Sequence, residues 1–175
     1  MLPTTGTKKS LFELVNLPET LESKLIDAHN LLDTRFLKDL KINIGNVLKG
    51  QNLSEKEAAL IALGVAINEK SAVLIDSLEQ IAKNLGTTDA ELAEVAGCVS
   101  VMNANNIFYR FKHFMHTNQN YQTMPAGIRM SIMMNPVLGK EYFELLSLAI
   151  SAVNGCEQCV TSHEASVKNH GGTEA

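Results

Sequence analysis

An internal repeat at an offset of 85 residues constrains the fold of this chain more than any other feature of its sequence. The segment Lys83–Ala90 aligns with Lys168–Ala175, and Leu60 and Leu63 align with Leu145 and Leu148 at the same offset. Self-similarity at a fixed offset indicates a repeated structural unit. We therefore expect a duplication, with residues 54–115 as the first repeat and residues 139–175 as the second.

Both repeats carry helix signals, and no stretch alternates apolar and polar residues as a strand does. Two N-cap candidates are followed three residues later by glutamate, which is the spacing of a capping box: Ser54 with Glu57, and Thr88 with Glu91. Apolar residues also recur at helical spacing over 11–47 and from Lys140 onward. These patterns predict an all-α protein.

We predict that residues 1–175 form a single helical domain. Residues 1–10 show no periodicity and are expected to be a polar tail. The polar stretch 116–124 is expected to be the main surface loop, and 129–134 a short helix. Asn154-Gly155 is expected to divide the last helical region into two helices.

Length and charge limit the classes of function. With 175 residues, 45% of them hydrophobic, the chain can bury an ordinary core without a metal ion or a structural disulfide. The net charge of −4 gives no basic excess, and Lys and Arg are scattered, so we expect no nucleic-acid partner. No apolar run of about 18 residues occurs, so we expect no membrane span and a cytoplasmic protein.

The second repeat places a carboxylate, two thiols and an imidazole between Glu144 and His163. In a helix that begins at Cys156, Cys159 lies at i+3 and His163 at i+7 on the same face. We expect Cys156 in the first helical turn, where the helix dipole favours a thiolate. His163 follows Cys159 by one turn and is close enough to exchange a proton with its sulfur.

Glu144 belongs to the preceding predicted helix, with Ser147 and Ser151 on the same face at i+3 and i+7. A carboxylate there can orient His163 and stabilise its cation, as the third member of a nucleophile, base and orienter triad does. The two serines are candidate supports of this pair.

Other interpretations of the cysteines remain open. A C-x-x-C pair is also half of a zinc site, and His163 would be a third ligand, with Cys98 or His170 as the fourth. Unreactive thiols are a further possibility. A close pair in a cytoplasmic chain indicates redox or metal chemistry, and we favour redox chemistry with no bound metal. Cys98 alone is expected to be a buried core residue.

The first repeat lacks this chemistry. It has Ala59, Ser71, Leu74 and Leu78 at the repeat positions of Glu144, Cys156, Cys159 and His163. The helix predicted after Thr88 has no counterpart in the second repeat, because the sequence ends at Ala175. We therefore expect that a final C-terminal helix of the fold is absent from this sequence.

From about Lys38 onward, the chain resembles the alkylhydroperoxidase D proteins of the carboxymuconolactone decarboxylase superfamily. The segments that carry the resemblance are Asn105–Arg110, Gly127–Met130, Asn135-Pro136, Phe143–Cys156, and Cys159 with His163-Glu164. The interval of twelve residues from Glu144 to Cys156, the C-x-x-C pair and the histidine four residues later all agree. The resemblance implies an all-helical duplicated core and homo-oligomers, commonly trimers.

The resemblance also implies an antioxidant reductase that binds no cofactor of its own. Its Cys156–Cys159 dithiol would receive electrons from dihydrolipoamide of a 2-oxo acid dehydrogenase complex. It would pass them to a peroxiredoxin and, weakly, to organic hydroperoxides. By position, Cys159 resembles the attacking thiol, Cys156 the more exposed thiol that closes the disulfide, and His163 with Glu144 the proton relay.

Gln158 departs from the family pattern, in which a histidine often precedes the second cysteine. A glutamine forms hydrogen bonds but does not shuttle protons near neutral pH. We therefore expect slower turnover than in relatives that have the histidine. Other superfamily members are decarboxylases or isomerases, and we favour that alternative less because those enzymes do not require a C-x-x-C pair.

Overall fold

Every regular element that the structure describes is helical, which confirms the predicted all-α class. The computed structural model describes residues 6–174. In chain order the elements are α1 (Gly6–Leu14), α2 (Lys24–Leu31), α3 (Arg35–Leu48), α4 (Glu55–Asn68), α5 (Ala72–Asn84), α6 (Asp89–Phe114), α7 (Gln119–Gln122), the 3-10 helix η1 (Ser131–Met133), α8 (Lys140–Val153) and α9 (Glu157–Asn169).

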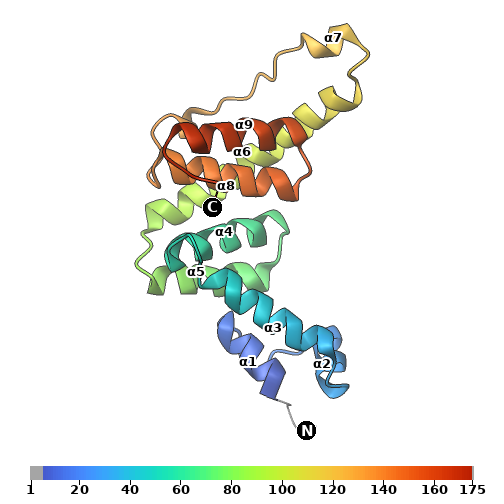
Figure 1. Ribbon diagram of the computed structural model, residues 1–175, viewed down its shortest axis with the longest axis vertical. Helices are drawn as coiled ribbons and strands as arrows, with labels where there is room; N and C mark the ends of the chain where they lie inside the picture. Colours follow the sequence, from blue (N-terminus) through green and yellow to red (C-terminus); the bar gives the residue numbers. More distant parts are fainter. Residues whose placement is uncertain (1–5, 175) are drawn as a thin grey trace.

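The molecule is elongated, with α1, α2 and α3 at one end and α7 at the other (Figure 1). Between these ends, the hairpin α4–α5 lies next to a layer formed by α6, α8 and α9. The long helix α6 contacts α4, α8 and α9. It therefore joins the two helical hairpins, α4–α5 and α8–α9.

The prediction of a polar tail over residues 1–10 is wrong for residues 6–10, which belong to α1. Residues 1–5 lie outside the described residues. Lys8 is buried, and its ammonium group pairs with Asp27 of α2, while Leu11 and Phe12 pack in a small core with Leu37. A buried lysine is stable where a carboxylate pairs with it, and local sequence does not reveal that distant partner.

Both predicted capping boxes are present: Ser54 with Glu57 begins α4, and Thr88 with Glu91 begins α6. In each, the N-cap side chain accepts a hydrogen bond from the N3 amide, and the glutamate accepts one from the N-cap amide. These bonds satisfy amide groups that have no partner within the helix. Glu91 also pairs with Lys56 Nζ at 2.8 Å, which links α6 to α4.

The main core forms where α4, α5, α6 and α8 meet. Its largest fully buried side chains include Leu60, Val95, Met102, Phe143, Leu146 and Ile150. A separate small cluster lies among α1, α2 and α3. Tyr142 joins the two hairpins, because its hydroxyl donates to the Glu57 carbonyl oxygen at 2.7 Å. The hairpins therefore share one core, and the three N-terminal helices have their own.

The helices follow the register of the sequence repeat. Each end of α8 lies 85 residues after the corresponding end of α4, and the same offset relates α9 to α5. The division of the domain into repeats at 54–115 and 139–175 stays an interpretation. The predicted surface loop at 116–124 contains the one-turn helix α7, and the short helix predicted at 129–134 is η1.

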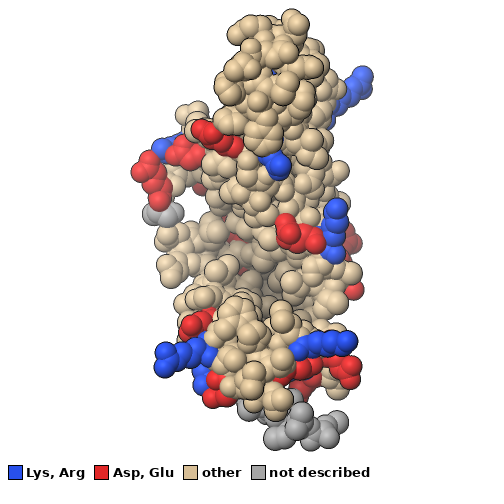
Figure 2. Space-filling view, turned by 90° about the vertical axis from the view of Figure 1, so that its right-hand side faces the viewer, with Lys and Arg blue, Asp and Glu red and all other residues tan. Residues whose placement is uncertain are grey.

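Charged side chains are scattered on the face shown in Figure 2, with Lys and Arg interspersed among Asp and Glu near the N-terminal end. A broad part of that face carries few charges. Among residues 6–174, no helix has both the length and the apolar character that a membrane span requires.

Candidate redox site

The turn between α8 and α9 brings the candidate site residues together. Asn154 caps the end of α8, and Gly155 follows with a φ of +67°, a conformation that glycine adopts without the steric cost borne by other residues. The amide of Cys156 then donates to the Ser151 carbonyl oxygen at 3.0 Å. This tight reversal packs α9 against α8, so Glu144 meets His163.

Asn154 anchors this turn to α4 and α6. Its Nδ2 donates to Asn103 Oδ1 at 3.0 Å and to Asn106 Oδ1 at 2.9 Å. Its Oδ1 accepts from Asn68 Nδ2 at 3.0 Å, and its carbonyl oxygen accepts from Arg110 Nη1 at 2.7 Å. The sequence identified Asn154-Gly155 only as a helix break and gave no sign of this network.

Cys156 and Cys159 form a disulfide bond, with their Cα atoms 5.3 Å apart. Only 1% of Cys156 and 7% of Cys159 is exposed. The expectation that Cys156 is the more exposed thiol is therefore wrong within one chain. The hydrogen bond from its amide to the carbonyl oxygen of the fully buried Ser151 holds Cys156 against α8.

The two cysteines occupy the N-terminus of α9. Cys156 is the N-cap residue, one position before the first turn in which the sequence placed it, and Cys159 lies in that turn as the N3 residue. Amide groups without intrahelical partners and the helix dipole favour negative charge there. The local structure therefore favours a thiolate once the disulfide is reduced.

Glu144 is buried, and each of its carboxylate oxygens has a basic partner. Oε2 lies 2.6 Å from His163 Nδ1, and Oε1 lies 2.7 Å from Lys140 Nζ. Burial raises the pKa of this carboxyl group, but the hydrogen bonds from His163 and Lys140 outweigh burial and lower the pKa from 4.5 to about 2.

The ionised state of Glu144 determines which ring nitrogen of His163 carries the donated hydrogen. An ionised carboxylate only accepts hydrogen bonds, so His163 Nδ1 donates to Glu144. The other ring nitrogen, Nε2, is then the atom that can exchange a proton with a neighbouring group. This is the base and orienter part of a nucleophile, base and orienter triad.

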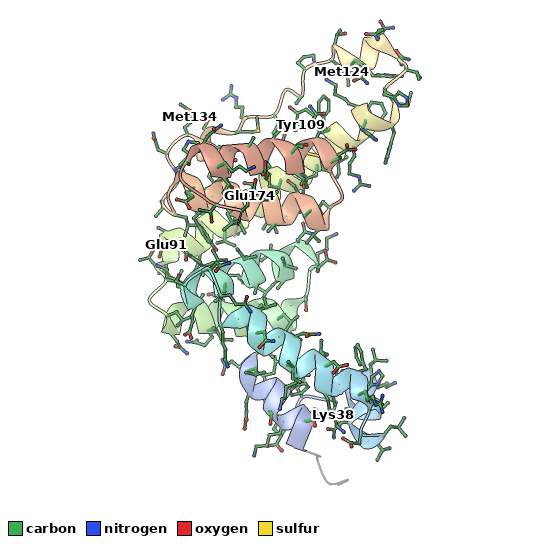
Figure 3. All side chains as sticks on the ribbon, in the orientation of Figure 1. Lys38, Glu91, Tyr109, Met124, Met134 and Glu174 are labelled. Carbon is green, nitrogen blue, oxygen red and sulfur yellow. A yellow bond between two sulfur atoms is a disulfide. The ribbon has the colours of Figure 1, made fainter. Side chains whose placement is uncertain are left out.

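Cys159 and His163 both line one cavity of about 200 Å³. Its walls come from α6, the segment around η1, and α9: Asn105, Tyr109, Met130, Met133, Gln158, Cys159, Ser162 and His163. Tyr109 is labelled on α6 in Figure 3. Because Cys159 lines this cavity and Cys156 does not, Cys159 is the sulfur that a small molecule in the cavity would meet.

Ser147 and Ser151 are fully buried but face α6. Ser147 Oγ lies 3.4 Å from Cys98 Sγ, and Ser151 Oγ accepts from Asn106 Nδ2 at 3.0 Å. No hydrogen bond among residues 6–174 joins either serine to the Glu144–His163 pair. Their face of α8 packs on α6, whereas the longer side chain of Glu144 reaches α9.

Sequence reasoning missed several side chains of the site. Lys140 precedes Glu144 by four residues, and this helical ion-pair spacing was an available signal. Asn105 and Tyr109 lie in a segment that carried the family resemblance, but nothing in the sequence directed them toward the cysteines. Gln158, by contrast, was singled out from the sequence, and it lines the cavity from an exposed position on α9.

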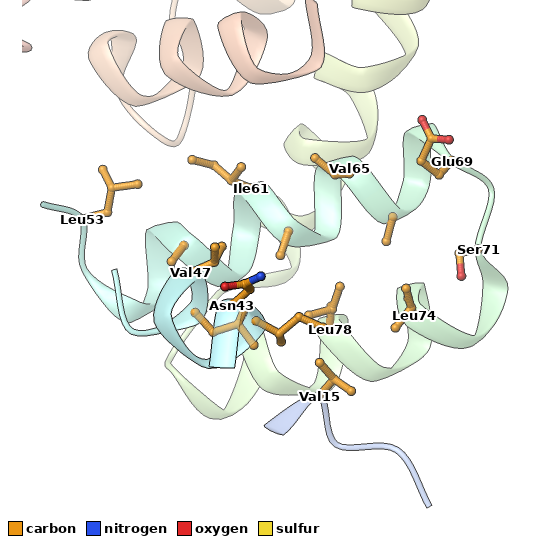
Figure 4. Close-up of a pocket in the computed structure, with 15 residues that line it drawn as sticks. Val15, Asn43, Val47, Leu53, Ile61, Val65, Glu69, Ser71, Leu74 and Leu78 are labelled. Carbon is orange, nitrogen blue, oxygen red and sulfur yellow. The ribbon is translucent and has the colours of Figure 1, made fainter. Parts of the chain in front are cut away.

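A second cavity, of about 480 Å³, lies away from the cysteines between α3, α4 and α5 (Figure 4). Its lining is almost entirely apolar and includes Ser71, Leu74 and Leu78. These three residues occupy the repeat positions of Cys156, Cys159 and His163. The first repeat therefore has an open apolar cavity at the place where the second has its thiols and imidazole.

The structure also shows where the residues of the zinc interpretation lie. Among residues 6–174, no three His, Cys, Asp or Glu side chains are grouped so that they could hold a metal ion. His163 is directed to Glu144, and neither Cys98 nor His170 joins the cysteine pair.

Comparisons with known proteins agree on one family. Residues 119–175 match the model of the Carboxymuconolactone decarboxylase family. Alkyl hydroperoxide reductase AhpD of Rhizorhabdus wittichii is 36% identical over 137 residues, which cover 78% of this chain and 78% of that protein. The protein of the same name from Streptomyces griseus is 39% identical over 137 residues, with coverage of 78% and 76%. The Brucella canis protein is 36% identical over 149 residues, with coverage of 83% and 78%.

Proposed function

The chain belongs to the alkyl hydroperoxide reductase AhpD family, and we propose that it is an antioxidant thiol-disulfide oxidoreductase that reduces organic hydroperoxides and a peroxiredoxin. One observation carries this proposal. Cys159, which is disulfide-bonded to Cys156, lines the same cavity as His163, which is hydrogen-bonded to the buried Glu144.

The first step uses the reduced dithiol. His163 takes the proton of the Cys159 thiol, and the Glu144 carboxylate stabilises the resulting imidazolium. The thiolate attacks the terminal oxygen of the hydroperoxide, so an S–O bond forms while the O–O bond breaks. The leaving alkoxide takes the proton from His163. The products are an alcohol and a Cys159 sulfenic acid, with two electrons transferred from sulfur to the peroxide.

The second step closes the disulfide. The Cys156 thiol attacks the Cys159 sulfenic sulfur, which releases water and forms the Cys156–Cys159 bond. A dihydrolipoamide-type dithiol then reopens this bond by two exchange reactions and leaves as the cyclic disulfide. With a peroxiredoxin disulfide as the acceptor, the Cys159 thiolate attacks sulfur instead of oxygen, and Cys156 resolves the mixed disulfide.

Peroxide-dependent oxidation of dihydrolipoamide tests this proposal. We expect activity in the wild-type protein and its loss in Cys159→Ser, because no other thiol lines the cavity. Cys98→Ser is the matched control, since Cys98 is buried at the α6–α8 contact and takes no part in the disulfide. Equal rates for wild type and Cys159→Ser, with and without a peroxiredoxin, would contradict the proposal.

The partners need separate measurements. A lipoyl-bearing subunit of a 2-oxo acid dehydrogenase complex should reduce the Cys156–Cys159 disulfide faster than free dihydrolipoamide at equal concentration. A peroxiredoxin disulfide should trap Cys156→Ser protein through Cys159. Sedimentation equilibrium then measures the homo-oligomer, for which we expect a trimer.

Cysteine-independent decarboxylase or isomerase chemistry is the alternative within the superfamily. It would survive replacement of both Cys156 and Cys159 by serine. A structural zinc site is the alternative outside redox chemistry, and it would give stoichiometric zinc in the purified protein together with metal-dependent stability.

A further inference from the structure

We propose that Asn105 positions the hydroperoxide substrate, its Oδ1 accepting the hydrogen bond from the peroxide O–H while Cys159 attacks. This inference rests on the proposed function and assigns a role to a residue outside the cysteine, histidine and glutamate set.

Asn105 is a buried amide whose oxygen has no partner in the protein. The residue is 5% exposed. Among residues 6–174, Oδ1 of Asn105 is one of three buried side-chain oxygen atoms without a hydrogen-bond partner. Buried polar groups in native proteins are almost always satisfied, so an unsatisfied one calls for a functional explanation.

The position of Asn105 supplies that explanation. Its side chain lines the cavity of about 200 Å³ that also contains Cys159 and His163. Asn105 comes from α6, whereas the sulfur and the imidazole come from α9. Its amide nitrogen donates to Met130 Sδ at 2.8 Å, so the partner of the amide within the protein is on the nitrogen side. We therefore assign the missing donor for Oδ1 to a molecule bound in the cavity.

The chemistry of the walls defines that molecule. The oxygen of a side-chain amide accepts and does not donate, so it selects a ligand that carries an O–H or N–H group. The neighbouring walls are largely apolar, with Tyr109, Met130 and Met133, and they suit an alkyl or aryl substituent. An organic hydroperoxide combines a terminal O–H with an apolar body. A dialkyl peroxide lacks the donor and would leave Oδ1 unsatisfied.

The proposed contact places the reacting atoms without taking part in electron transfer. The hydroperoxide keeps its O–H proton on the oxygen that Cys159 attacks, and that proton remains in the sulfenic acid. The alkoxide leaves on the other side of the broken O–O bond and takes its proton from His163. Asn105 is therefore a positioning residue whose hydrogen bond exists with hydroperoxide substrates and not with disulfide substrates.

Two rate constants measured on the fully reduced protein test this role. One is for thiol oxidation by cumene hydroperoxide, and the other is for reaction with 5,5′-dithiobis(2-nitrobenzoic acid), a disulfide with no O–O bond. Asn105→Leu removes the acceptor and keeps the volume filled, and Asn105→Ala removes it and enlarges the cavity. In both variants we expect the rate constant for the hydroperoxide, divided by that for the disulfide, to fall about tenfold. This is the effect expected when one hydrogen bond to the substrate is lost.

Thr87→Val is the matched control. Thr87 also has a buried hydroxyl oxygen without a partner among residues 6–174, but it does not line the cavity. Its replacement should leave the ratio of rate constants unchanged. The pH profile of the disulfide reaction should be the same in all variants, because Asn105 does not set the protonation of Cys159.

Three outcomes of these measurements would overturn the proposed role of Asn105. An unchanged ratio in both Asn105 variants overturns the role of Asn105 while the proposed function stands. A parallel fall of both rate constants indicates a structural role and overturns it as well. A wild-type protein that reacts with the disulfide but not with the hydroperoxide contradicts peroxide reduction itself, and the role of Asn105 fails with it.

Discussion

Glu144 is a buried charged side chain of α8, paired with Lys140 of the same helix on one oxygen and with His163 of α9 on the other. Burying one of these groups without its partners would be costly, whereas the set of three keeps the carboxylate ionised. The ionised Glu144 therefore makes the stability of the protein depend on pH, and it also orients the imidazole of His163.

We predict that the free energy of unfolding falls as the pH is lowered from about 4.5 to about 2. The folded-state pKa of Glu144 is lowered, so its contribution is complete above the unfolded-state pKa and is lost as the pH falls through the folded-state pKa. Its size is on the order of 3 kcal/mol. Urea unfolding of wild type and Glu144→Gln at pH 7 and pH 2.5 measures it. A gap between the two proteins that does not narrow at pH 2.5 would refute the prediction.

Cys98 is predicted to be an unreactive thiol. Burial raises its pKa to about 11, although a hydrogen bond with Ser147 opposes this effect. After reduction, the native protein should show two thiols that react with a water-soluble disulfide reagent and a third only on denaturation. Three reactive thiols in the native state would show that the α6–α8 contact opens.

Gln158→His is predicted to increase the rate of peroxide reduction, because a histidine at this cavity-lining position adds a group that titrates near neutral pH. Gln158→Glu is a control that changes the charge without adding an imidazole. Stopped-flow oxidation of the reduced proteins between pH 6 and 8 measures the effect. A rate for Gln158→His at or below that of wild type would contradict the expectation.

At the scale of elements, the α8–α9 turn is the segment that assembles the site. Gly155→Ala is predicted to destabilise the protein by about 1–2 kcal/mol, because residue 155 has a positive φ. Gly45→Ala, in the interior of α3, is the control. A methyl group there meets Leu14 at ordinary contact distance, so the change should be neutral or stabilising by up to about 1 kcal/mol. Chemical denaturation compares the two variants, and equal effects would refute the argument.

Sequence patterns were sufficient for elements whose signals are local. The capping boxes at Ser54 and Thr88 and the break at Asn154-Gly155 each specify a helix end within a few residues, and the structure has those ends. Residues 6–10 of α1 were missed because the burial of Lys8 depends on Asp27 in another helix. Asn105 and Lys140 were missed as site residues because their roles depend on how α6 and α8 pack.

At the scale of the whole molecule, the two hydrophobic clusters differ in size. The main cluster includes residues of both hairpins, and the cluster of α1–α3 has Leu11, Phe12 and Leu37 at its centre. We predict that amides of α1 and α2 exchange hydrogen about ten times faster, or more, than those of Leu63 and Leu146, because small clusters open locally. Hydrogen exchange with residue resolution tests this, and equal protection in both clusters would show one cooperative unit.

The positions of the two repeats along the chain could be predicted from the sequence. How the helices of one repeat pack against those of the other could not. An offset of 85 residues matches helix ends in the two hairpins, yet no repeat pattern states that α6 of the first repeat supplies a wall of the second repeat's cavity. That contact is non-local, so no local pattern in the sequence indicates it.

The apolar cavity of the first repeat has an evolutionary consequence. The changes that would copy the chemistry of the second hairpin into the first are Glu55→Lys, Ala59→Glu, Ser71→Cys, Leu74→Cys and Leu78→His. Glu55 must be included, because it stands where Lys140 neutralises the buried carboxylate in the other copy. At these five positions the two hairpins therefore carry different chemistry on helices whose ends match, so one helical frame serves both a reacting copy and a silent one.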